Sequence, residues 1–251
     1  MARNFTNDVI RFSIGACNIT HPHTWAGIVR RNEDGTGHVI FAVDTVPDGA
    51  DPVLRFRLEG ANTFQYQVDG AGSSSAFTVV AADGWVLLAA KKATGTVAPR
   101  VSKFVYSTQT WTHENLTARA DNTLPGAGGE VRFARGNEAS NQPWRGDMLL
   151  QGFWNVVLSD SEVESLPYSL AHWFKPSAVG LWLLDQASTG QTVIDLTGGG
   201  ANQSAIIGTT VATNHPKFFS RGHPVIKMRP GAAAAPPAAG GHRLALLGVG
   251  R

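Results

Sequence analysis

Short apolar runs separated by turn residues constrain the fold of this chain more than any other feature of its sequence. In residues 54–58, Leu54, Phe56 and Leu58 alternate with two arginines, and residues 63–68 repeat the pattern. Strict alternation places apolar side chains on one face of a strand and polar side chains on the other. Similar runs recur between turns of Gly, Asn, Asp and Pro: 8–14, 25–30, 38–43, 76–80, 85–90, 103–107, 130–134 and 148–157. This spacing predicts an all-β fold of two packed antiparallel sheets.

Composition favours one large β domain and excludes several classes of partner. Of the 251 residues, 43% are hydrophobic and 16% are charged, which is enough apolar material for a sizeable core. The net charge is +2, from 21 basic and 19 acidic residues without a basic stripe, so no nucleic acid partner is expected. The longest apolar runs, 85–90 and 178–184, are too short to cross a bilayer, so no membrane insertion is expected. The single cysteine, Cys17, excludes an internal disulfide.

One short helix is predicted at residues 159–166. Ser159 and Glu162 have the spacing of a capping box, in which each side chain bonds the backbone N–H of the other residue. An apolar face follows, and Pro167 limits the helix.

Changes in composition divide the chain into three parts. Residues 1–166 hold the predicted sandwich, and residues 167–222 are expected to form a continuation that packs on it. Residues 223–251 are rich in Ala, Pro and Gly, which is typical of an extended C-terminal arm. Apolar residues return near its end and are expected to anchor the arm to a partner protein: Leu244, Leu246, Leu247 and Val249. A terminus without a fixed conformation is the alternative.

Three segments together resemble the laminin-G-like and concanavalin A-like jelly-roll family. Residues 83–92 resemble its central strand pair, in which a tryptophan follows a glycine and enters the core. Residues 129–136 resemble a later strand that ends in Gly, and residues 144–163 resemble the closing strand and capped helical turn. The resemblance implies a two-sheet antiparallel jelly-roll sandwich. The sequence departs from the family at Asp147, where an apolar residue is usual, and no acidic calcium ligands can be assigned.

Residues 180–202 resemble the continuation found in laminin-G-like proteins of actinobacterial phages. Those proteins are minor tail or accessory virion proteins. The resemblance implies a structural component of the virion, on the phage tail, which docks on other virion proteins, contacts host surface glycans and forms a homo-oligomer in the assembly. A capsid decoration protein on the capsid surface and a stand-alone carbohydrate-binding module are the alternatives.

No set of catalytic residues is found, and no enzymatic activity is expected. Glycosidases of this fold carry a Glu-x-Asp-x-x-Glu run on one strand, which is absent here. The densest acidic group, at residues 160–164, fits a helix N-terminus, where carboxylates are favoured by the helix dipole. The pair His21 and His23 is more typical of a loop than of a metal site. Nucleotide-binding and serine hydrolase motifs are also absent, so no cofactor or metal is expected.

Two tryptophans are candidates for ligand binding. Trp111 and Trp144 lie in loop-like, polar stretches, where an exposed indole could stack on a sugar ring. Packing against a neighbouring protein is the alternative for both. Four other tryptophans are assigned to the core: Trp85, Trp154, Trp173 and Trp182.

Overall fold

The structure is a computed structural model of the chain. It describes residues 2–5, 9–12, 19–34, 38–44, 54–60, 62–68, 71–118, 124, 130–134, 143–184, 193, 195–197, 203–207 and 210–212. The chain divides into two compact units, Met1–Phe219 and Ser220–Arg251, and every described residue belongs to the first. Cys17 and the predicted anchor residues of the C-terminal arm therefore lie outside the described residues: Leu244, Leu246, Leu247 and Val249.

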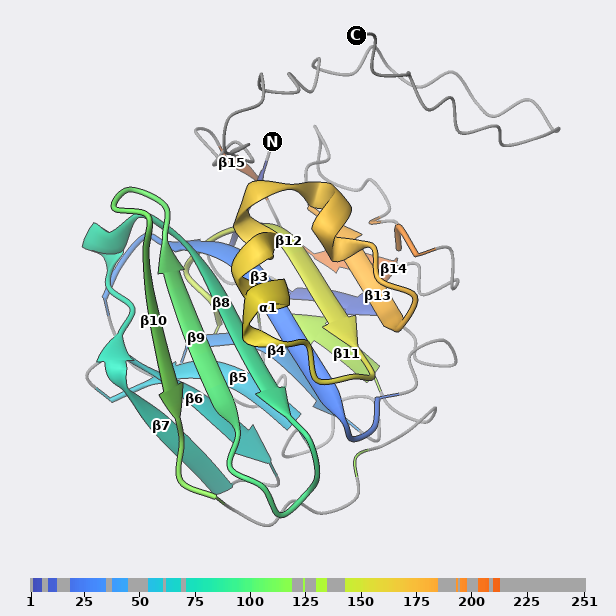
Figure 1. Cartoon of the computed structure of the whole chain (residues 1–251). Helices are drawn as coiled ribbons and strands as arrows, with labels where there is room; N and C mark the ends of the chain where they lie inside the picture. Colours follow the sequence, from blue (N-terminus) through green and yellow to red (C-terminus); the bar gives the residue numbers. More distant parts are fainter. Residues whose placement is uncertain are drawn as a thin grey trace, which may run out of the picture. The chain divides into compact units, whose positions relative to one another are not determined.

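Two antiparallel sheets pack face to face, which confirms the predicted all-β sandwich (Figure 1). Sheet A has the strand order β10 (Thr110–Asn115), β9 (Arg100–Val105), β8 (Trp85–Lys92), β3 (His23–Arg31), β12 (Gly146–Trp154), β1 (Ala2–Phe5) and β15 (Thr210–Ala212), and β13 (Ala178–Leu183) also pairs with β12. Sheet B has the order β14 (Gln203–Ile207), β2 (Val9–Phe12), β11 (Glu130–Phe133), β4 (His38–Asp44), β5 (Leu54–Glu59), β6 (Thr63–Val68) and β7 (Ala71–Thr78).

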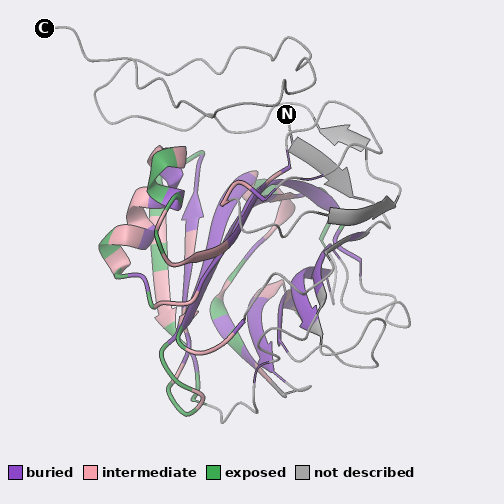
Figure 2. Ribbon diagram, turned by 90° about the vertical axis from the view of Figure 1, so that its right-hand side faces the viewer, coloured by how far each residue is buried: buried purple, intermediate pink, exposed green. Residues whose placement is uncertain are grey.

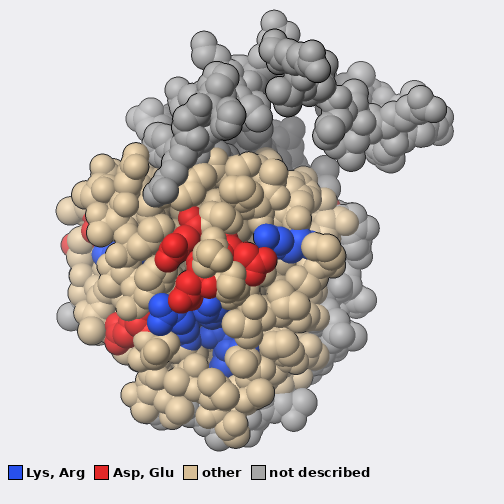
Figure 3. All heavy atoms as spheres, viewed as in Figure 1, with Lys and Arg blue, Asp and Glu red and all other residues tan. Residues whose placement is uncertain are grey.

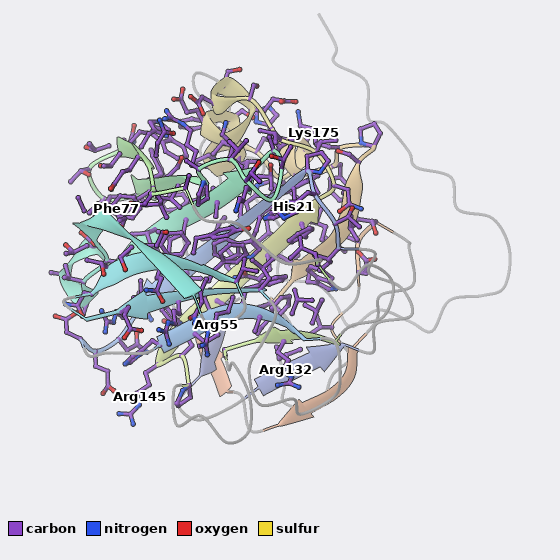
Figure 4. The ribbon with its side chains drawn as sticks, turned by 90° about the horizontal axis from the view of Figure 1, so that it is seen from below. His21, Arg55, Phe77, Arg132, Arg145 and Lys175 are labelled. Carbon is purple, nitrogen blue, oxygen red and sulfur yellow. The ribbon has the colours of Figure 1, made fainter. Side chains whose placement is uncertain are left out.

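The alternation along β5 and β6 produces the two faces of sheet B. Leu54, Phe56 and Leu58 are wholly buried in the core between the sheets. Arg55 lies on the opposite face, where its Nε donates to Gln67 Oε1 on β6 at 2.6 Å. Figure 4 shows Arg55 on the side of sheet B that faces away from sheet A. A one-residue shift of register would exchange these two sets of side chains, so the burial of one face specifies the pairing.

Aromatic rings fill the core between the sheets. Trp25 on β3 stacks on Phe56 of β5, with ring centroids 4.6 Å apart and planes inclined by 17°. Its indole N–H donates to Gln151 Oε1 at 3.2 Å, which satisfies the one polar atom of the side chain. Further buried rings join this cluster: Phe41, Phe64, Tyr66, Phe133, Phe153 and Trp182.

A second core lies on the outer face of sheet A, the face directed away from sheet B. It is covered by α1 (Asp160–Ser165), η3 (Leu166–Tyr168) and η4 (Leu170–Trp173), which cross the sheet in Figure 1. Trp173 is wholly buried there, and its Nε1 donates to the Leu166 carbonyl at 2.9 Å. Sheet A is therefore buried on both faces over its centre, whereas the helical segment is mostly intermediate with some exposed residues (Figure 2).

The predicted helix and core tryptophans are confirmed. Ser159 caps α1, and both hydrogen bonds of its capping box with Glu162 are present. The four tryptophans assigned to the core are 8% exposed or less: Trp85, Trp154, Trp173 and Trp182. No helix among the described residues is long and apolar enough to span a bilayer.

The structure also contains strands that the sequence did not predict. β10 has the sequence Thr-Trp-Thr-His-Glu-Asn, which lacks an apolar face, and it becomes a strand through its six-residue pairing with β9. β13 pairs with β12, so this part of the expected continuation is itself a strand of sheet A.

Candidate functional site

Trp111 lies on β10, the terminal strand of sheet A in the described structure, and is partly exposed. On its buried side the ring packs against Phe104 of β9, with centroids 5.0 Å apart. It also stacks on His113, two residues along the strand, at 5.3 Å and with an angle of only 7° between the planes. Neighbouring side chains thus hold an aromatic ring at the rim of sheet A, as the prediction of a ligand-binding tryptophan requires.

His113 is fixed on two sides by hydrogen bonds. Its Nδ1 lies 2.8 Å from the Ser102 hydroxyl on β9, and its Nε2 lies 3.1 Å from Glu164 Oε1 on α1. Because a carboxylate only accepts, Nε2–H donates to Glu164, and when the ring is neutral the serine hydroxyl donates to Nδ1. The pair of hydrogen bonds sets the plane of the ring on which Trp111 stacks.

A hydroxyl, an imidazole and a carboxylate in a row are also the elements of a hydrolase triad. Here Ser102 is 3% exposed and stands in the middle of β9, directly opposite His113. A nucleophile has to reach its substrate, and this hydroxyl lies in the layer between sheet A and the helical segment. The hydrogen bonds from Ser102 and Glu164 are suited to holding His113 in place, and the arrangement is not suited to acyl transfer.

Charged side chains surround the N-terminus of α1. Asp160 accepts from Lys91 Nζ at 2.6 Å and from Arg100 Nε at 3.0 Å. The hydrogen bond from Lys91 is the main cause that lowers the pKa of Asp160. The backbone N–H of Ser159 does the same for the pKa of Glu162, assisted by Lys175. Figure 3 shows these charges gathered around α1, while most of that face carries none.

Trp144 is completely buried, which corrects the expectation of an exposed indole at this position. It lies in the irregular segment before β12, as expected, but its side chain belongs to the core between the sheets. Its ring meets His38 of β4 edge-on, at 6.4 Å and 88°. Of the two tryptophans predicted to bind a ligand, only Trp111 is partly exposed.

His38 is a titratable residue that the sequence did not single out. Burial, followed by the nearby charges of Arg31 and Arg145, lowers its pKa to about 4. Arg31 is itself buried, and it donates to Asn62 Oδ1 at 2.7 Å and to the Val79 carbonyl at 2.9 Å. No local signal in the sequence identifies this group, because its members come from separate segments of the chain.

The histidine pair is placed where β3 begins. His23 is the first residue of the strand and is wholly buried, with Nε2 3.1 Å from the Tyr66 hydroxyl. His21 lies just before it, with its ring 4.8 Å from that of His23 (Figure 4). Within the described ranges, no group of three or more His, Cys, Asp or Glu side chains could hold a metal ion. His23 packs among aromatic rings, which is a structural role.

Comparison with known proteins supports the fold. No protein family model and no curated protein matches the sequence. Among solved structures, a protein from Bacteroides ovatus whose assigned candidate function is carbohydrate binding is similar, with a TM-score of 0.59 and 15% identity over 85% of this chain. The alignment covers 61% of that protein, so this chain spans about three fifths of its length. The fold is a concanavalin A-like jelly roll.

Two further solved structures align with a part of this chain. A heptameric pentraxin from Limulus polyphemus aligns with 65% of this chain and 78% of its own, at 15% identity and a TM-score of 0.43. A tailspike protein of an Escherichia coli O157:H7 bacteriophage aligns with 72% of this chain and 26% of its own, at 14% identity and a TM-score of 0.48.

Proposed function

We propose that this chain is a non-enzymatic virion protein, a minor tail protein, that contacts host surface glycans with the outer face of sheet A around Trp111. The observation that carries the glycan contact is the partly exposed Trp111, held by Phe104 and His113 at the rim of the sheet. The sequence resemblance to laminin-G-like phage proteins supports the place in the virion. In this proposal the C-terminal arm docks on other virion proteins.

The surroundings of Trp111 suit a carbohydrate. A pyranose presents an apolar face of C–H groups that packs on an indole, and a rim of hydroxyls that need hydrogen-bond partners. His113 and the half-exposed Glu164 lie on the same face of sheet A as Trp111, whereas alternation along β10 directs Thr110 and Thr112 to the other face. An imidazole and a carboxylate therefore stand on the same face as the ring, where they can hydrogen-bond the hydroxyls of a sugar.

Binding to host cell-wall glycans by the full chain tests the proposal. Trp111→Ala should lower the affinity about 5- to 30-fold, because stacking on an aromatic ring contributes on the order of 1–2 kcal/mol. Trp111→Phe should keep part of it. Val97→Ala is the matched control, because Val97 is an exposed apolar residue (46%) in the turn between β8 and β9.

Two outcomes contradict the proposal. Glycan binding that is equal in the wild type and in Trp111→Ala removes the site. Reducing ends released in the same incubations, and abolished in Glu164→Gln, would make the protein an enzyme. Immunogold labelling of particles tests the place in the virion: label on the tail supports the proposal, label on the capsid surface favours a decoration protein, and particles without label contradict both.

A further inference from the structure

The backbone of β10 presents one row of hydrogen-bonding groups to β9 and another to the edge of sheet A. Just beyond β10, the Leu116 N–H donates to the Pro99 carbonyl at 2.9 Å, in continuation of the register between the two strands. Hydrogen-bonded and non-hydrogen-bonded pairs alternate along an antiparallel ladder. The residues of β10 that bond to β9 therefore follow in steps of two from Leu116: Glu114, Thr112 and Thr110. The intervening residues direct their N–H and C=O groups to the open edge: Trp111, His113 and Asn115.

Several of the devices that usually protect a terminal strand are absent from β10, and the inward-directed Glu114 is its one charged residue. β10 has no proline, no lysine and no bulge, and its register with β9 is continuous over six residues. Within the described ranges no strand pairs with its outer side. The backbone of β7, at the neighbouring edge of sheet B, is instead hydrogen-bonded to side chains of sheet A. Glu114 accepts from the Ala76 N–H, and Lys103 donates to the Thr78 carbonyl. Figure 1 shows β10 at the rim of sheet A, with α1 lying over other strands.

We infer that β10 pairs antiparallel with β10 of a second copy of this chain, about a two-fold axis at Thr112. A two-fold axis perpendicular to the sheet keeps the outer faces of both copies on one side. The edge-directed Trp111 then pairs with the partner's His113, and His113 pairs with the partner's Trp111. Both are hydrogen-bonded pairs, so four backbone hydrogen bonds form across the axis.

The side chains of β10 are complementary to themselves in this register. Trp111 meets an imidazole across the axis, as it already does within its own strand at 5.3 Å. Thr112 meets Thr112 of the partner subunit, a pair that is favourable between antiparallel strands. Thr110 meets the partner's Glu114, so no like charges face each other. A shift of the axis to His113 would place two imidazoles opposite each other, which favours the register at Thr112.

The pairing has a consequence for the outer face of sheet A. The two Trp111 rings become diagonal neighbours, with Cα atoms about 7–8 Å apart. Two partly exposed indoles then form one wider aromatic surface, to which both copies contribute. Its value for glycan binding rests on the proposed function, whereas the pairing itself does not.

The interface is small. Four backbone hydrogen bonds and two aromatic pairs fall below the size of a standard stable interface, so a dissociation constant in the micromolar range is expected. The assembly of several copies on a particle would raise the local concentration and favour the paired form.

Sedimentation velocity of the full chain across about a 100-fold range of concentration tests the inference. Thr112→Lys places two positive charges directly opposite each other at the axis, and should weaken dimerisation at least 10-fold. Thr110→Lys introduces the same charge two residues away, opposite the partner's Glu114, and should leave dimerisation unchanged or strengthen it. Both positions are exposed on the same strand, so both variants should keep the melting temperature of the wild type.

The two variants separate the possible outcomes. A protein that stays monomeric at every concentration overturns the inference, and so does a dimer that both lysine variants weaken equally. An equimolar mixture of Thr112→Lys and Thr112→Glu should restore association, which charge repulsion at another surface would not do. A monomeric Thr112→Lys variant that still binds glycans supports the pairing at β10 and leaves the proposed function intact. If Trp111→Ala loses glycan binding but still dimerises, the result supports the proposed glycan site and leaves the pairing of β10 in place.

Discussion

Single residues of the same type take different roles in this fold because of what surrounds them. Trp111 and Trp144 both stand in polar, turn-like sequence, yet the first is partly exposed and the second is wholly buried. His113 is held between two hydrogen bonds near the surface, whereas His38 is 7% exposed between two arginines. Side-chain type alone therefore does not assign the role.

We expect His38 to make stability depend on pH. Burial lowers its pKa from 6.5 to about 4, so the fold holds the neutral ring. Its contribution is fully present above about pH 6.5 and is lost as the pH falls towards 4, because the unfolded chain binds the proton first. Between about pH 7.5 and pH 5 the wild type should lose roughly 2 kcal/mol of unfolding free energy from this residue, measured by urea unfolding.

The variant His38→Gln removes this titration and should flatten the pH dependence over that interval. His172→Gln is the control, because it removes an exposed histidine from η4. If His38→Gln loses as much unfolding free energy on acidification as the wild type, the assignment to His38 is wrong.

At the scale of elements, local capping and long-range pairing both fix the helical segment on sheet A. Ser159 caps α1 locally, while Asp160 joins the helix to β8 and β9 through Lys91 and Arg100. The lowered pKa of Asp160 means that this link contributes stability above the unfolded pKa of the carboxyl and is lost as the pH falls below it.

Removing the cap should destabilise the protein measurably. We expect Ser159→Ala to lower the unfolding free energy by about 1 kcal/mol, because it leaves a helix N–H without its acceptor. Ser107→Ala is the matched control, since Ser107 is exposed in the turn between β9 and β10. Equal urea midpoints for Ser159→Ala and the control would show that the cap contributes nothing.

At the scale of the whole molecule, the sandwich is expected to fold without the C-terminal arm. Among the described residues, the buried members of both cores lie before position 194, and the second compact unit begins at Ser220. An Ala/Pro/Gly-rich segment buries too little apolar surface to order itself, so the arm needs an external surface. Four aliphatic side chains near its end could contact such a surface: Leu244, Leu246, Leu247 and Val249.

Deletion of residues 229–251 should therefore leave the melting temperature unchanged and lower the occupancy of the protein on particles. The two quantities are measured on the same preparation, by calorimetry and by quantitative blotting of purified particles. A truncated protein that unfolds, or that is incorporated as well as the full chain, contradicts the role of the arm.

The part of the candidate site that could be predicted from the sequence is Trp111 itself. Trp111 lies between two threonines and close to a histidine, whereas the segments expected to form the core are apolar runs. Its surroundings could not be predicted, because Ser102 and Glu164 are distant in the sequence and reach His113 only through the pairing of β9 with β10 and the docking of α1.

Local patterns in the amino-acid sequence are enough to predict the sandwich and the cap of α1. Alternation along β5 assigns Leu54, Phe56 and Leu58 to one face, and the spacing of Ser159 and Glu162 defines the cap. Three features instead arise from contacts between distant segments: the burial of Trp144, the pKa of His38 and the existence of β10 as a strand. They could be seen only in the folded chain, because contacts between distant segments leave no periodic signal in the sequence.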